Sequence, residues 1–218
     1  MIPLSGSFMK QEMKALFPGK MVLGLTGGVG SGKSMVMGFL RESFGAFTIE
    51  ADKVCAALIE KDGSSFEDML SLMGSEILDQ EGAIDRSKMS RLIFSDSTLR
   101  EKVNQILHPA TFEAARALIE ATDSPLIVYE SAIPRQARLK ELCHRVLYVY
   151  TPLKLRISRL EEARGYSPEK TKAIMASQPD HETYRSLSDA TLYNGRSQKE
   201  CFRRLKAIMK EWGVQEQK

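Results

Sequence analysis

The fold of this chain is decided by the stretch VLGLTGGVGSGKS, which runs from Val22 to Ser34. Its apolar first half predicts a short buried strand, and its second half matches the pattern G-x-x-x-x-G-K-(S/T) without a mismatch. Residues 35–40 continue at helical spacing, so the pattern stands between a strand and a helix. In that context the backbone N–H groups of residues 28 to 34 are expected to wrap a polyphosphate at the positive end of the helix. The stretch therefore predicts a nucleotide-binding loop.

The residue types of this loop predict separate roles for its members. Lys33 is expected to reach the β- and γ-phosphates of a nucleotide, and the Ser34 hydroxyl to ligate Mg²⁺. The alternative is a glycine-rich turn that binds nothing, and the lysine and serine in register argue against it. The predicted nucleotide-binding residues of this region are Gly28, Val29, Gly30, Ser31, Gly32, Lys33, Ser34 and Met35.

Length and composition restrict the class of protein. A chain of 218 residues with 43% hydrophobic and 27% charged residues suits one globular domain with inserted subdomains, or at most two domains. A net charge of +3 is compatible with small anionic substrates. A nucleic-acid-binding protein is expected to show a stronger basic stripe and more than 7% aromatic residues. The sequence leaves the oligomeric state open, a monomer included.

The sequence also predicts a location. No stretch approaches the roughly 20 apolar residues of a membrane span, and the first twenty residues lack the apolar core of a signal peptide. The three cysteines, Cys55, Cys143 and Cys201, are far apart and lack metal-ligand spacing. We therefore expect reduced thiols in a cytoplasmic protein with no membrane partner.

The hydrophobic pattern predicts an α/β fold with a doubly wound, mostly parallel sheet that carries helices on both faces. Further strands are expected at residues 46–49, 125–130 and 145–150, and a short last strand with a turn at residues 189–195. Residues 63–122 read as helical and exceed an ordinary crossover, so we expect an inserted helical subdomain. His108 and Pro109 are expected to break a helix there. The predicted division is an extension at 1–20, a nucleotide-binding core at 21–62, 124–152 and 186–218, a helical substrate subdomain at 63–123, and a lid at 153–185.

Two carboxylates follow predicted strands, where ligands bind in open α/β sheets. Asp52 lies 19 residues after Lys33 and is predicted to be catalytic, although Asp also suits the N-cap of a helix at residues 53–59. Glu130 ends the strand at 125–130 and is predicted to help organise Mg²⁺. Because such elements normally carry Asp, pairing with a nearby base is the alternative for Glu130.

Arginines concentrate in the predicted lid. Arg156 and Arg159 are three residues apart on a helix, so they share a face. Charged residues at such spacing often lie on a solvent-exposed face of a helix. Two helices joined by a turn at residues 165–168 instead favour a mobile lid, which brings arginine to the transferring phosphoryl group and excludes water.

Taken together, these motifs resemble the dephospho-CoA kinase family over residues 21–212. The resemblance is carried by Gly24 to Ser34, Ala51-Asp52, Gly82-Ala83-Ile84-Asp85-Arg86, His108-Pro109, Glu130-Ser131-Ala132-Ile133, Arg156-Ile157-Ser158-Arg159, Gln178, and Ser188-Asp189 through Asn194. It implies transfer of the γ-phosphoryl group of ATP, with Mg²⁺, to the ribose 3′-hydroxyl of dephospho-CoA. It also implies a nucleotide core, a helical CoA domain and a small lid.

The resemblance assigns roles residue by residue. Asp52 corresponds to the general base, Arg159 and Arg164 to catalytic lid arginines, and Asn194 to a nucleotide contact. Arg86 and His108 correspond to acceptor contacts, while a salt bridge and a helix stop are their structural alternatives.

Three segments depart from the family pattern. Glu50 replaces an Asp beside the base, residues 133–136 lack an expected acid, and Arg164 is followed by Gly165 rather than Asp. Which lid arginine meets the phosphates, and whether Glu50 or Glu130 organises Mg²⁺, therefore stay open. The remaining alternatives for function are a kinase of another nucleoside or nucleotide, and a nucleotide-binding module without catalysis.

Overall fold

The computed structural model describes residues 17–135 and 137–217. These residues form two compact units. The helical unit is Glu50–Leu118, and the sheet unit consists of the described residues up to Ile49 and from Ile119 onward. The helical unit is thus an insertion in the chain of the sheet unit.

A five-stranded sheet with the order β2-β3-β1-β4-β5 forms the centre of the sheet unit. Its strands are β1 (Met21–Thr26), β2 (Phe47–Glu50), β3 (Leu126–Glu130), β4 (Arg145–Tyr150) and β5 (Ala190–Tyr193). β1 pairs in parallel with β3 and β4, and β4 pairs in parallel with β5. Leu25 lies opposite Glu130, so the loop after β1 begins level with the end of β3. The predicted α/β class and its mostly parallel sheet are confirmed.

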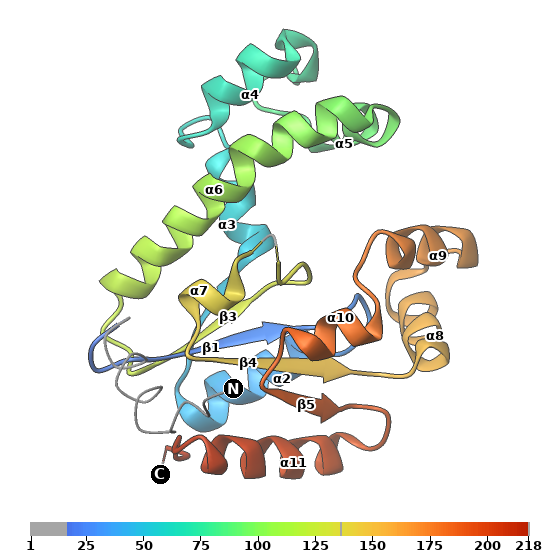
Figure 1. Ribbon diagram of the computed structural model, residues 1–218. Coiled ribbons are helices and arrows are strands. Elements are labelled where there is room, and N and C mark those ends of the chain that lie inside the picture. The colour runs from blue at the N-terminus through green and yellow to red at the C-terminus, as the bar shows by residue number, and fades with distance from the viewer. Residues whose placement is uncertain (1–16, 136, 218) are drawn as a thin grey trace, which may run out of the picture. The chain divides into compact units, whose positions relative to one another are not determined.

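Helices cover both faces of this sheet (Figure 1). The helices of the sheet unit include α2 (Lys33–Phe44), α7 (Leu139–Leu142), α8 (Leu153–Arg164), α9 (Pro168–Ala176), α10 (His181–Ser186) and α11 (Gln198–Glu211). α2 and α11 lie on one face, and α7 and α10 on the other. Alternate residues of β1 and β4, such as Leu23 and Leu147, pack with Leu40 of α2 and Leu205 of α11 in one apolar core. Burial on both faces explains why the central strands read as continuous apolar runs.

Local signals set the ends of the helices that cover the core. Gly45 ends α2 in a left-handed conformation, with φ 65°; its N–H donates to the Arg41 carbonyl, and the following Ala46 N–H donates to the Leu40 carbonyl. The Ser197 side chain caps α11 by accepting a hydrogen bond from the Glu200 N–H.

The helical unit contains α3 (Ala51–Leu58), α4 (Phe66–Met73), a short 3₁₀ turn (Ser75–Ile77), α5 (Arg86–Ser95) and most of α6 (Ser97–Ala121). It has its own apolar core, in which Met69 and Ile77 are completely buried. Asp85 caps α5, and its carboxylate accepts from the N–H groups of Ser87 and Lys88. These hydrogen bonds lower the pKa of Asp85.

The predicted helix break at His108-Pro109 is wrong. α6 runs without interruption from Ser97 to Ala121, with Pro109 inside it. Proline removes one backbone hydrogen bond, but Leu107 and Phe112 on either side are buried. Packing of these neighbours offsets the local cost and keeps the helix continuous. None of the described helices, α6 included, is both long and apolar enough to span a membrane.

The start of the described chain is part of the packed structure. Phe17 is buried, and its ring meets the His144 ring edge-on, with centroids 6.4 Å apart. Lys20 Nζ donates to the carbonyls of Ile119 and Glu120, at 2.8 and 2.7 Å. Residues 17–20 therefore belong to the sheet unit rather than to the predicted extension, whose residues 1–16 lie outside the described part of the chain.

We predict that Leu205→Ala lowers the free energy of unfolding of the sheet unit by about 2–5 kcal/mol, because it leaves a cavity in a fully buried position. Trp212, the one tryptophan of the sequence, packs against this core and reports its unfolding by fluorescence in a urea titration. Leu155→Ala, at a position with 40% exposure, is the control and should shift the transition little. Equal shifts for both variants would contradict the packing described here.

Candidate active site

The glycine loop joins β1 to α2 and places the N-terminus of that helix at the end of the strands. Gly30 and Gly32 adopt left-handed conformations, with φ 75° and 94°. A Cβ atom on Gly32 would also collide with the Asn194 side-chain amide. Only glycine fits at this position, and the motif requires it there for that reason.

Side chains hold three alternate carbonyls of the loop. The Gly27 carbonyl accepts from Lys33 Nζ at 2.8 Å, and the Val29 carbonyl from Arg156 Nε at 2.8 Å. The Ser31 carbonyl accepts from Asn194 Nδ2 at 2.8 Å and from the Thr151 hydroxyl at 2.9 Å. In a planar trans peptide the C=O and the following N–H point in opposite directions. Fixing these carbonyls therefore aims the N–H groups of residues 28, 30 and 32 the other way.

A buried polar cluster supports the loop from the ends of β4 and β5. Thr151 and Asn194 are both 2% exposed. Arg159 adds to this cluster from α8, donating to the Thr151 hydroxyl oxygen at 3.3 Å and to the Asn194 carbonyl at 3.2 Å. Asn194, predicted to contact the nucleotide, thus has its amide engaged with the loop backbone, and Arg159 lies against the same cluster.

Lys33 and Glu130 form an ion pair beside the loop. Lys33 Nζ lies 3.4 Å from Glu130 Oε1, and each side chain is 12% exposed. The pairing alternative for Glu130 is therefore realised. The pair also brings the carboxylate next to the lysine that is expected to bind the phosphates.

The residues at this position fit Mg²⁺ only together with phosphate. Ser34 lies exposed in the first turn of α2, and Glu130 ends the neighbouring strand β3. Among the described residues there is no group of three or more His, Cys, Asp or Glu side chains that could hold a metal. Mg²⁺ commonly takes one or two protein ligands and completes its shell with phosphate oxygens and water.

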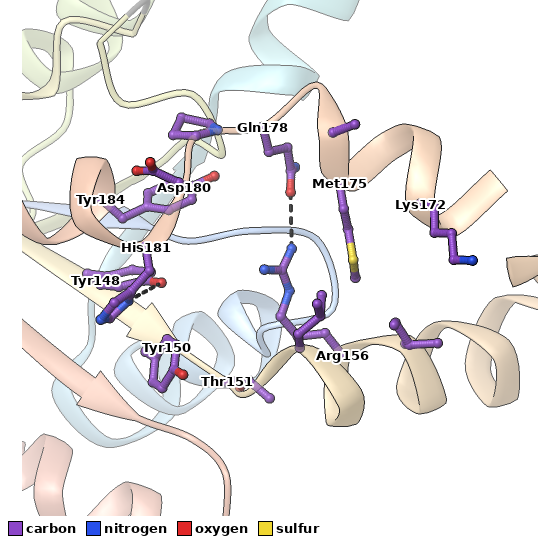
Figure 2. A pocket seen from close by; sticks show the side chains of 14 residues that line it. Tyr148, Tyr150, Thr151, Arg156, Lys172, Met175, Gln178, Asp180, His181 and Tyr184 are labelled. Carbon is purple, nitrogen blue, oxygen red and sulfur yellow. Dashed lines mark hydrogen bonds between the residues drawn. The ribbon is translucent and has the colours of Figure 1, made fainter. Parts of the chain in front are cut away.

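Two residues of the predicted lid contact the loop directly. Gln178 Oε1 accepts from the Val29 N–H at 2.8 Å, and an Arg156 amino group lies 3.3 Å from the same oxygen (Figure 2). Burial lowers the pKa of Arg156. The solvated-face interpretation is therefore wrong for Arg156. The set of predicted site residues omitted Arg156, Gln178 and Thr151, although the Arg156–Arg159 spacing pointed to a shared face.

The predicted base lies in the helical unit. Asp52 is exposed in the first turn of α3, two residues after β2 ends. Because the helix begins at Ala51, Asp52 is not its N-cap. Cys55 follows one turn later; burial raises the pKa of its thiol, and the nearby Asp52 charge adds to that effect.

The predicted acceptor contacts lie in the same helical unit. Arg86 donates to the Ala56 carbonyl and pairs with Glu60, each at 3.1 Å, so its salt-bridge alternative is realised. His108 lies in the middle of α6, and partial burial lowers its pKa. Its helix-stop alternative is excluded by the continuity of α6.

The departures from the family pattern are accounted for in part. Glu50 pairs with Lys53 at 2.7 Å, whereas Glu130 pairs with the loop lysine. Arg164 ends α8, and its side chain lies outside the described part of the chain, as does residue 136.

Comparison with known proteins gives the family that the chain resembles. The family model described as dephospho-CoA kinase matches residues 21–200. A dephospho-CoA kinase of Geobacillus kaustophilus is 30% identical over 199 residues, covering 90% of this chain and 98% of the relative. The crystal structure of TT1252 from Thermus thermophilus has a TM-score of 0.77 at 28% identity, over 88% of this chain and 97% of its own. A dephospho-CoA kinase from Campylobacter jejuni shares the fold, with a TM-score of 0.60 at 20% identity over 88% and 97% of the two chains.

We predict that Thr151→Val weakens ATP binding about tenfold, because it removes one donor to the Ser31 carbonyl from a buried site. Calorimetric titration with ATP measures the effect. Thr151→Ser restores the hydroxyl and should recover most of the affinity. If valine and serine variants bind ATP alike, this hydroxyl does not set the geometry of the loop.

Proposed function

The chain belongs to the dephospho-CoA kinase family, and from that premise we propose how its residues divide the work of the reaction. The reaction transfers the γ-phosphoryl group of ATP to the ribose 3′-hydroxyl of dephospho-CoA, giving CoA and ADP in the last step of CoA biosynthesis. The observation that carries this conclusion is the family match over residues 21–200, which spans the loop, Asp52 and the lid.

The loop and its lysine bind the donor in this proposal. The N–H groups of residues 28 to 34 and the start of α2 hold the phosphates, and Lys33 neutralises charge on the β- and γ-phosphates. Phosphoryl transfer passes through a loose transition state, so positioning and charge neutralisation do most of the catalysis. Arg159 and Arg164 are the proposed lid cations for that charge. Arg159 is the better supported of the two, because it donates to Thr151 and Asn194 beside the loop.

Asp52 accepts the proton of the attacking hydroxyl. A sugar hydroxyl is a poor nucleophile, and a carboxylate within hydrogen-bond reach can remove its proton. Two features support this role. Asp52 lies two residues after the end of β2, and it is not the N-cap residue of α3. The helical subdomain at 63–123 supplies acceptor contacts, with Arg86 and His108 as the proposed residues.

Mg²⁺ bound with ATP supplies electrostatic stabilisation of the phosphate charge. We assign its protein ligands to the Ser34 hydroxyl and Glu130. Glu130 is chosen over Glu50 because it lies beside Lys33 of the phosphate loop, whereas Glu50 lies beside Lys53. A small-molecule kinase of this kind is proposed to act in the cytoplasm without nucleic-acid or membrane partners.

The reaction is tested by incubating purified protein with MgATP and dephospho-CoA, and following ADP release and CoA formation. Uridine, AMP and shikimate serve as competing acceptors. We expect turnover with dephospho-CoA and only background ADP release with the others. ADP release with another acceptor but not with dephospho-CoA would overturn the assignment of substrate. ATP binding without turnover of any acceptor would indicate that the protein is a nucleotide-binding module without catalysis.

We predict that Asp52→Asn lowers kcat about 100-fold or more while ATP affinity stays the same, the scale expected for loss of a positioned base. Single-turnover kinetics and an ATP titration separate the two quantities. Asp62→Asn, at an exposed position of the same unit, is the control. Near-normal turnover of Asp52→Asn would show that another group takes the proton.

We further predict that Glu130→Gln raises the Mg²⁺ concentration needed for half-maximal rate roughly tenfold or more. The rate is measured against free Mg²⁺ at saturating ATP. Glu50→Gln is the matched control and should leave this requirement unchanged. A raised Mg²⁺ requirement for Glu50→Gln but not for Glu130→Gln would assign the metal to Glu50.

A further inference from the structure

A cavity of about 580 Å³ opens within the sheet unit, between the end of β4 and the helices α8, α9 and α10. Its volume lies in the range of small-molecule sites. The residues proposed above for the donor, base and metal do not line it. Figure 2 shows its ring side chains gathered on one side and Met175 and Lys172 on the other, with the Arg156–Gln178 hydrogen bond between them.

One wall of this cavity is aromatic. Tyr148 and Tyr150 alternate along β4 and therefore face the same side of the sheet. The His181 ring lies 4.6 Å from the Tyr150 ring and 5.7 Å from the Tyr148 ring, centroid to centroid. Tyr148 also stacks on Tyr184 at 5.0 Å, and its hydroxyl lies 3.2 Å from His181 Nδ1. These contacts fix Tyr148 behind the half-buried Tyr150 and the exposed His181, which line the cavity.

The opposite boundary is cationic and continues into the phosphate loop. Arg156 lines the cavity and at the same time donates to the Val29 carbonyl. Its guanidinium lies where a Cβ atom on Gly28 would stand, so the arginine is packed directly on the loop. Lys172 adds a second cation to the lining. A ligand in the cavity therefore meets rings at one end and, through Arg156, the loop at the other.

The stereochemistry of transfer indicates which substrate this space suits. The attacking and leaving oxygens are in line, so the acceptor approaches the γ-phosphate from the side opposite ADP. In the proposed function ADP is held at the start of α2, which lies on one face of the sheet, whereas α10 lies on the other. Tyr184 of α10 stacks on Tyr148. In dephospho-CoA the attacking 3′-hydroxyl and the adenine belong to one nucleoside, so the ring must lie close to the transferred phosphate.

We propose that this cavity binds the adenine ring of a substrate nucleotide against Tyr150 and His181, and that this nucleotide is the acceptor, dephospho-CoA. The inference rests on the proposed function. Aromatic side chains hold bases by stacking, and the planar guanidinium of Arg156 offers a second stacking surface next to the loop. Asp180 also lines the cavity, but its carboxylate is engaged in capping α10, where it accepts from the Thr183 N–H.

The test replaces the ring of Tyr150 in the full chain. Tyr150→Leu is expected to raise both the KM and the Kd for dephospho-CoA about tenfold or more, on the scale of one lost base–aromatic stack. The KM for ATP and the Kd for ADP should not change. Tyr150→Phe keeps the ring and should behave as the wild type. Phe47→Leu is the matched control, because it removes a 39% exposed ring at the first residue of β2, whereas Tyr150 is the last residue of β4.

Each outcome decides the proposal. A rise confined to dephospho-CoA supports it. A rise confined to ATP and ADP assigns the cavity to the donor and overturns the acceptor assignment, and no rise for either substrate overturns the whole proposal. If Tyr150→Leu is unstable by thermal unfolding, His181→Ala at an exposed side chain repeats the test. Failure of the proposed function is distinct, because the wild type would then form no CoA from dephospho-CoA.

Discussion

The geometry of the phosphate loop depends on where its carbonyl groups are held. A planar peptide cannot turn its N–H toward a phosphate unless its C=O points away, and a buried carbonyl needs a donor there. Lys33, Arg156, and the pair of Thr151 and Asn194 supply those donors to alternate carbonyls of the loop. These side chains therefore position the backbone of the phosphate site, and among them only Lys33 is also proposed to contact the phosphates of ATP.

This support links the loop to the segments that surround it. Thr151 and Asn194 directly follow β4 and β5, so the parallel sheet brings both to one edge. Arg156 and Gln178 belong to the predicted lid and bond to both backbone groups of Val29. A movement of that segment cannot leave the loop unaffected, because it must break or carry along these hydrogen bonds. Any movement of the proposed lid is thereby coupled to the backbone of Val29 in the loop.

The groups proposed for catalysis are divided between the two units. The donor loop, Lys33 and Glu130 belong to the sheet unit, whereas Asp52, Arg86 and His108 belong to the helical unit. The chain enters the helical unit immediately after β2, so the proposed base is among the first residues of the inserted unit. In the proposed mechanism the sheet unit therefore binds the donor, and the inserted unit supplies the base.

The α/β class, the five strands, the phosphate loop and the position of Asp52 after a strand could all be predicted from the amino-acid sequence. These features are contiguous, so apolar runs, glycines and a fixed spacing report them directly. Only the tertiary structure decided that Thr151, Asn194, Arg156 and Gln178 meet the loop, because they join it from more than 100 residues away. It also decided that α6 continues through Pro109, where burial of neighbouring residues outweighs a local preference. Long-range hydrogen bonds and packing leave no periodic trace in the chain, and for this reason the support of the site could be seen only in the folded molecule.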